Sequence, residues 1–163
     1  MLLEMKVFGL TIDPFTNAPI VILKDMDEKN ALPVWIGVLE ASAIAAELEK
    51  IQFSRPMTHD LVKEILKTLQ IDVTKIEVTD LKDNVYYATI HMASKGTAFT
   101  VDARPSDAIA LALRMSSPIF VDTRVLDKSK SIDMRAEGKQ GSAKDLIEML
   151  DQLSPDEFGK YKM

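Results

Sequence analysis

The chain has 163 residues, of which 47% are hydrophobic and none is cysteine, and its 20 Lys and Arg against 25 Asp and Glu give a formal net charge of −5. These totals are typical of a single globular domain. They exclude disulfide bonds, thiolate metal sites and a cysteine nucleophile. They also disfavour a protein that coats nucleic acid nonspecifically, because such proteins carry a strongly basic surface.

The sequence has no apolar run near the ~20 residues that a membrane span needs. Its N-terminus, MLLEMKVFGL, contains Glu4 and has no basic region ahead of its apolar residues, which alternate as in a strand. A secretory signal is therefore not expected. We predict a cytoplasmic protein that does not enter a membrane.

The first part of the chain has the pattern of three strands followed by a helix. Alternating apolar residues and turn residues such as Asp13-Pro14 mark the strands, and Pro33 favours an edge position or a strand start for the third. Further apolar residues then recur at helical spacing. We predict strands over Met5–Ile12, Ala18–Leu23 and Leu32–Ile36 and a helix over Glu40–Phe53.

A second helix and three more strands come next. Residues 54–57 break the first helix, and Thr58 has the position of an N-cap for a helix over Leu61–Leu69. We expect this helix to bury an apolar stripe that consists of Leu61, Ile65, Leu66 and Leu69. The strands that follow are predicted over Lys75–Leu81, Val85–Met92 and Ala98–Asp102.

The stretch DARPSDAIALALR, Asp102–Arg114, joins the last of these strands to the most apolar helix of the chain. Pro105 fixes its own φ and favours extended geometry at Arg104, so the turn is stiff. Ser106 has the position of an N-cap, and Asp107 lies where the helix dipole favours negative charge. Because this helix is apolar on nearly every side, we expect it at the centre of the domain. A short strand over residues 119–121 follows it.

The two halves share their order of elements and some of their letters. Ala43-Ile44-Ala45-x-x-Leu48 returns about 65 positions later as Ala108-Ile109-Ala110-x-x-Leu113. A few alanines can match by chance, but this match falls on the same element of each half. We predict an α+β fold with an internal duplication, in which two related β-β-β-α halves surround a mixed sheet with an intervening helix.

After the last predicted strand the chain becomes polar. Asp127–Gly141 contains two glycines and four basic residues, which indicates a long loop. Ser142-x-x-Asp145 resembles a capping box ahead of apolar residues at helical spacing. We therefore predict a domain at 1–126 and an appendage at 127–163, a polar loop with C-terminal helices that pack on the same domain or on a partner subunit.

Two Arg-Pro corners each precede a helix start that carries a hydroxyl and an acid. Arg55-Pro56 is followed by Thr58 and Asp60, and Arg104-Pro105 by Ser106 and Asp107. Capping and dipole complementarity account for both arrangements. A helix N-terminus beside an arginine also binds anions such as phosphate, so both interpretations stay open.

The side chains suited to proton transfer or metal binding are few. His59 stands at a helix start beside Asp60, the better position for a general base or ligand, whereas His91 lies on a strand face where packing or a hydrogen bond is expected. Glu40 would hold a hard cation only where it converges with Asp102 or Asp107. The sequence has no Gly-rich phosphate loop, nucleophile elbow or zinc-finger spacing.

Three stretches, taken together and in this order, resemble the bifunctional nuclease domain family, formerly a domain of unknown function. They are LPVWIGVLEASAIA at Leu32–Ala45, RPMTHDL at Arg55–Leu61 and DARPSDAIALALR at Asp102–Arg114. The chain resembles a compact bacterial member, and its three Asn and four Gln fit a thermophilic source although nine Met do not. The resemblance implies an α+β domain of two related halves with nuclease activity toward DNA and RNA, and brings no agreed mechanism.

The first hypothesis is a nuclease that hydrolyses phosphodiester bonds of DNA and RNA with the help of a divalent cation, Mg²⁺ or Mn²⁺. The alternative is a non-catalytic module that binds a small anion or a protein partner, and a third interpretation gives Arg104 only a structural ion pair with an acid of its corner. We expect a homodimer in either case. In the first hypothesis the metal ligands are Asp102, Asp107 and Glu40, and the catalytic residues are His59 as base, Arg55 and Arg104 on the phosphate, Asp60 and Ser106.

Overall fold

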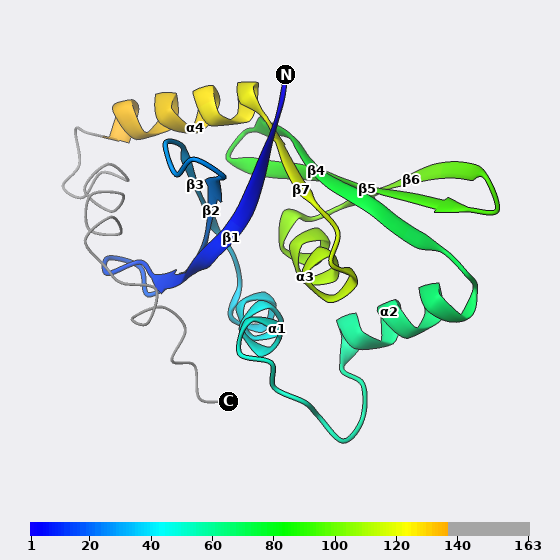
Figure 1. The fold of residues 1–163 in the computed structure, drawn as a ribbon. Helices are drawn as coiled ribbons and strands as arrows, with labels where there is room; N and C mark the ends of the chain where they lie inside the picture. The colour runs from blue at the N-terminus through cyan, green and yellow to red at the C-terminus, as the bar shows by residue number, and fades with distance from the viewer. Residues whose placement is uncertain (137–163) are drawn as a thin grey trace.

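The computed structural model describes residues 1–136, which form a seven-stranded mixed sheet with four helices (Figure 1). The elements follow the predicted order of strands and helices, and one more helix comes at the end. Their bounds are β1 (Leu2–Ile12), β2 (Pro19–Asp25), β3 (Ala31–Trp35), α1 (Val38–Leu48), α2 (Thr58–Thr68), β4 (Asp72–Lys82), β5 (Val85–Ser94), β6 (Thr97–Ala103), α3 (Pro105–Met115), β7 (Ile119–Asp122) and α4 (Thr123–Ala136).

The strands lie in the order β3-β2-β1-β7-β4-β5-β6. The short strand β7 is antiparallel to β1 and parallel to β4, and it joins two antiparallel three-stranded units. The predicted α+β class is confirmed, and Pro33 lies on an edge strand as predicted. A duplicated chain would give this arrangement of two matching halves, and the duplication itself stays a prediction.

Helices α1 and α3 pack against each other and against the sheet, α1 on β2 and α3 on β4 and β5. The side chains of residues 108–112 on α3 are all buried, and Ile44 and Ala45 of α1 belong to the same core. The prediction that α3 lies at the centre of the domain is therefore confirmed. Apolar faces at helical spacing on two helices explain why these two segments meet.

Helix α2 differs from the sequence-based expectation. None of its residues is buried, and Leu61, Ile65 and Leu69 of the predicted stripe are 49%, 49% and 59% exposed, while Leu66 alone is packed partly against the core. The prediction of a buried stripe is wrong for these three leucine and isoleucine side chains. Polar residues of the first turn attach α2 to α3, and this contact rotates most of the stripe away from the core.

The prediction that the hydroxyls of Thr58 and Ser106 cap α2 and α3 is also wrong. The N-cap positions of α2 and α3 are held by Met57 and Arg104, each with extended backbone, and Pro105 takes the first helical position of α3. Asp60 takes over part of the capping role of Thr58, because its Oδ2 accepts a hydrogen bond of 3.1 Å from the Met57 backbone N–H. Ser106 is instead buried in the first turn of α3.

The ends of two further helices depart from prediction for local reasons. Helix α1 ends at Leu48 rather than Phe53, because Lys50 adopts a left-handed φ of 54°. The loop predicted from Asp127 is wrong for residues 127–136, which belong to α4. Asp122 accepts a hydrogen bond of 2.9 Å from the Arg124 backbone N–H and so starts that helix. The remaining predicted loop and the C-terminal helices of residues 142–163 lie outside the described residues.

Within residues 1–136, no helix is both long and apolar enough to cross a bilayer.

Candidate functional site

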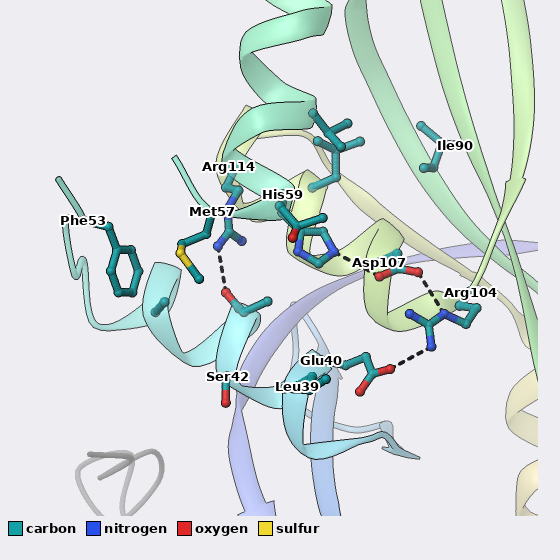
Figure 2. Close-up of a pocket in the computed structure, with 15 residues that line it drawn as sticks. Leu39, Glu40, Ser42, Phe53, Met57, His59, Ile90, Arg104, Asp107 and Arg114 are labelled. Carbon is teal, nitrogen blue, oxygen red and sulfur yellow. Dashed lines mark hydrogen bonds and ion pairs between the residues drawn. The ribbon is translucent and has the colours of Figure 1, made fainter. Parts of the chain in front are cut away.

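A pocket of about 750 Å³ opens between α1, α2 and α3 beside strand β5 (Figure 2). Residues from four elements and from the segment between α1 and α2 line it, so the pocket exists only in the folded chain. Most of the lining is apolar and comes from Leu39, Phe53, Met57, Val62, Ile90 and Leu111. The volume lies within the ~300–1,000 Å³ of pockets that bind small ligands.

A continuous series of polar side chains follows one wall of the pocket, as Figure 2 shows. His59 Nε2 lies 3.0 Å from Asp107 Oδ1. The other oxygen of Asp107 accepts a hydrogen bond of 2.9 Å from Arg104 Nε, and Arg104 Nη1 donates to Glu40 Oε1 at 2.7 Å. Four of the residues singled out in the sequence are thus brought together from three helices and the corner before α3.

The charges along this series stabilise one another. Burial opposes ionisation of Asp107, but hydrogen bonds from Arg104 and His59 outweigh it and hold the pKa of Asp107 below its ordinary value. The pKa of Glu40 is also lowered, by the backbone N–H at its own helix start and by Arg104. The two acids in turn raise the pKa of Arg104. Near neutral pH the pocket therefore holds two carboxylates and a guanidinium between them.

The residue ahead of α1 leaves room for this arrangement. Gly37 is the N-cap of α1, and a Cβ atom at this position would collide with Oε2 of Glu40. The glycine therefore lets the Glu40 carboxylate fold back over its own helix start while it accepts the hydrogen bond from Arg104.

A second, buried group of contacts holds the three helices together. The side chain of Arg114 is only 3% exposed, and its Nε donates to Asp60 Oδ1 at 2.7 Å. Its other nitrogens donate to the backbone oxygens of Ala110 at 3.0 Å and Ala43 at 2.9 Å. One guanidinium thus connects α1, α2 and α3 around the pocket. Sequence reasoning missed this role, although an arginine that ends the most apolar helix was the available signal.

Asp60 does not line the pocket, but it positions its neighbour His59. Burial opposes its ionisation, but Arg114 and the Met57 N–H lower its pKa below the ordinary value. Because both of its oxygens accept hydrogen bonds within α2 or from α3, Asp60 fixes the start of α2 and with it His59.

Besides Asp60, three of the predicted site residues do not line the pocket. Arg55 and Asp102 are exposed, in the segment between α1 and α2 and on β6, and Ser106 is buried in α3. His91 is half-buried on its strand face, with Nε2 3.3 Å from a Glu77 oxygen but without the geometry of a hydrogen bond. Arg104 does form the predicted corner ion pair with Asp107, and it adds a contact with Glu40 that reaches across to α1.

The three predicted metal ligands do not assemble as a set. Glu40 and Asp107 approach each other through Arg104, while Asp102 lies outside the pocket lining. Among residues 1–136, no group of three or more His, Asp or Glu side chains has an arrangement that could hold a metal ion. A cation bound by Glu40 and Asp107 would have to take both acids from Arg104. A requirement for Mg²⁺ or Mn²⁺ stays a prediction.

Comparison of this chain with models of known protein families finds one that matches. The bifunctional nuclease domain matches residues 21–134, which is well over half of the chain. The chain belongs to the bifunctional nuclease domain family. The resemblance seen in the three sequence stretches is thereby confirmed, and membership in this family supports a nuclease-like role.

Relatives within the family are both bacterial and plant proteins. An uncharacterised protein of Mycobacterium tuberculosis is 31% identical over 162 residues, which cover 95% of this chain and 97% of the mycobacterial one. Bifunctional nuclease 1 of Arabidopsis thaliana is 32% identical over 119 residues, covering 70% of this chain and 36% of the plant protein. Bifunctional nuclease 1 of Oryza sativa subsp. japonica is 31% identical over 110 residues, which cover 64% of this chain and 33% of the rice protein. The chain therefore corresponds to about a third of each plant nuclease.

Proposed function

We propose that the pocket hydrolyses phosphodiester bonds of DNA and RNA, with His59 as general base and Arg104 as the group that binds the phosphate. The observation that carries this proposal is the hydrogen-bonded series from His59 through Asp107 to Arg104 on the wall of a pocket large enough for a nucleotide. Membership in a nuclease family supports the same reaction class.

The pairing of His59 with Asp107 gives the imidazole a defined role. When Nε2–H donates to Asp107, the neutral ring keeps its lone pair on Nδ1, and the carboxylate stabilises the imidazolium once a proton is taken up. In the proposed step a water oxygen attacks phosphorus while His59 Nδ1 accepts its proton. The bond from phosphorus to the leaving sugar oxygen then breaks, and that oxygen receives a proton from the imidazolium.

In the proposed step Arg104 offsets the charge that develops on the phosphate. Its side chain is 64% exposed, and its contacts with Glu40 and Asp107 use Nη1 and Nε of a group that has five N–H donors. The two acids hold the guanidinium in place beside His59. Pre-organised donors of this kind stabilise a transition state without reorganisation during the reaction.

The test is cleavage of labelled single-stranded RNA and DNA by the purified full-length protein. We expect His59→Ala to lower the rate by about 10²- to 10⁴-fold, the range for removal of a general base. Circular dichroism must show that the variant is folded. Cleavage that persists at the wild-type rate in folded His59→Ala would overturn the proposal.

Asp102→Asn is the matched control and also tests the role of a cation. Asp102 lies outside the pocket lining, so its substitution leaves the rate unchanged if the proposed residues act without it. Parallel assays with Mg²⁺, Mn²⁺ and EDTA measure any need for a divalent cation. Cleavage that strictly requires a divalent cation and is lost in Asp102→Asn would favour the metal-assisted hypothesis over the step proposed here.

A specific observation favours a second function, the formation of a homodimer through α2. Leu61, Ile65 and Leu69 recur every four residues and form an exposed apolar stripe along the helix. We propose that a second copy of the chain covers this stripe. Sedimentation analysis is expected to show a dimer that Ile65→Asp dissociates, and a monomeric wild type would overturn this second proposal.

A further inference from the structure

The polar wall of the pocket is accompanied by apolar surface that the proposed reaction does not use. Phe53 and Met57 lie between α1 and α2, and Leu39 and Val62 extend the apolar lining along these two helices. All four are among the large hydrophobic side chains that are exposed. Soluble domains rarely leave a contiguous apolar surface open without using it to bind something.

The charges of the pocket provide little attraction for a nucleic-acid backbone. Binding through phosphates depends on Lys and Arg that release counterions. The described lining includes two arginines, and Arg114 is buried with hydrogen bonds to Asp60 and two backbone oxygens. The other, Arg104, is already shared by two carboxylates, and the whole chain has a net charge of −5. Affinity for a nucleic acid must therefore come largely from another source.

We infer that the apolar half of the pocket binds an unpaired nucleobase, which makes single-stranded nucleic acid the substrate class of the site. This inference rests on the proposed function, since it places the phosphate next to that base against Arg104. Figure 2 shows Phe53 and Met57 on the opposite side of the pocket from Arg104 and Asp107, so that one nucleotide can meet both surfaces. Every base has an aromatic face that stacks on such a side chain.

Phe53 is the specificity-determining residue in this arrangement. Phe53 is 38% exposed and is an aromatic residue of the lining. In a duplex the bases are stacked and paired, and a base that enters a pocket must first leave its partner. Single strands do not meet this cost, so the pocket discriminates by strand state and tolerates different bases.

The test is fluorescence anisotropy with full-length His59→Ala protein, in which cleavage does not consume the probe. Three labelled oligonucleotides of equal length are compared, namely a single strand of mixed sequence, the same backbone with abasic residues, and a blunt duplex. We expect the abasic strand and the duplex to bind at least about tenfold more weakly than the single strand. Affinity for the single strand should fall with salt at a slope near that of one phosphate contact, about −0.7.

Variants of two phenylalanines sharpen the test. Phe53→Ala should weaken binding of the single strand by about 5- to 150-fold, the range for loss of one base–aromatic stack, and Phe53→Trp should retain it. Phe15→Ala is the matched control, because Phe15 is 67% exposed in the turn between β1 and β2 and does not line the pocket. Its affinity is expected to equal that of the parent protein.

The outcomes separate this inference from the proposed function. Equal affinity for the abasic and the base-containing strand, or unchanged affinity in Phe53→Ala, overturns the base pocket whatever the cleavage assays show. Base-dependent binding by a protein that cleaves neither RNA nor DNA supports the pocket and overturns the proposed hydrolysis. A salt slope several times steeper than expected would also contradict the inference, because the backbone would then supply the affinity.

Discussion

Helices α2 and α3 meet at the pocket, but they are held in the molecule in different ways. Most residues of α3 are buried, and its apolar side chains belong to the core. Helix α2 has no buried residue and is attached chiefly by polar contacts of its first turn, His59 to Asp107 and Asp60 to Arg114. Non-polar packing therefore fixes one wall of the pocket and hydrogen bonds fix the other.

This difference has a consequence for the proposed chemistry. The acid that orients the base, Asp107, and the guanidinium that would bind the phosphate, Arg104, lie at the start of the firmly packed helix. The proposed base, His59, lies on α2, which has few buried apolar contacts. Segments with few buried apolar contacts open at lower free energy than the core, so α2 is the wall that can yield when a substrate enters.

The largest expected effect comes from the residue that connects the two helices. Arg114→Met removes the partner of Asp60 and the donors to two backbone oxygens, leaving a carboxylate without its buried counter-charge. We expect the free energy of unfolding to fall by about 3–5 kcal/mol, as when one partner of a buried pair is removed. Urea denaturation measures it. Arg104→Met, at an exposed guanidinium, serves as control, and equal losses in the two variants would contradict the anchoring role of Arg114.

A pair of isoleucines tests the contrast in packing directly. Ile109 of α3 is fully buried, whereas Ile65 of α2 is half exposed. At a protein concentration low enough to keep the chain monomeric, Ile109→Ala should cost about 2–5 kcal/mol and Ile65→Ala no more than about 0.5 kcal/mol, by the same urea measurement. A large loss in Ile65→Ala would show that the α2 stripe is covered in solution, as the proposed homodimer requires, and its size would then depend on protein concentration.

The smallest effect concerns acid stability. Asp60 and Asp107 have pKa values lowered from 3.8 in the folded chain, so the unfolded chain binds more protons near that pH. Their contribution to stability is complete above the unfolded pKa and is lost as the pH falls through the lower folded values. We expect urea midpoints to decline below about pH 4, and to decline less steeply in Asp107→Asn. Parallel declines in the two proteins would exclude Asp107 as a contributor.

The strands and the buried position of α3 could be predicted from the sequence, because the pattern of apolar residues in each fits one kind of element. Alternation predicts β1 and β4, turn residues bound most of the other strands, and an apolar surface on all sides can only be buried. The convergence of Glu40, His59, Arg104 and Asp107 followed in part from their positions at helix starts. We expected Glu40 to converge with Asp102 or Asp107, but the sequence does not show which of these two acids approaches it.

Other features could not be predicted because they depend on contacts between distant segments. An amphipathic pattern shows that α2 has an apolar face, but Arg114 decides which face turns toward α3 by drawing Asp60 inward. Asp102 and Asp107 are near each other in the sequence, yet Asp102 lies on a strand outside the pocket lining and Asp107 lies in the first turn of a helix that lines the pocket. Their spacing in the sequence does not show that only Asp107 lines the pocket.

The position of β7 has a consequence for how the chain is made. This four-residue strand is the last of the sheet to be synthesised, yet it lies between β1 and β4 and is the link between the two halves. Until residues 119–122 leave the ribosome, each three-stranded unit has an inner edge with open hydrogen-bonding groups. A growing polypeptide therefore has an open inner edge on β1 from early in its translation and a second on β4 once residues 72–82 have been made, and neither edge closes before β7 is available.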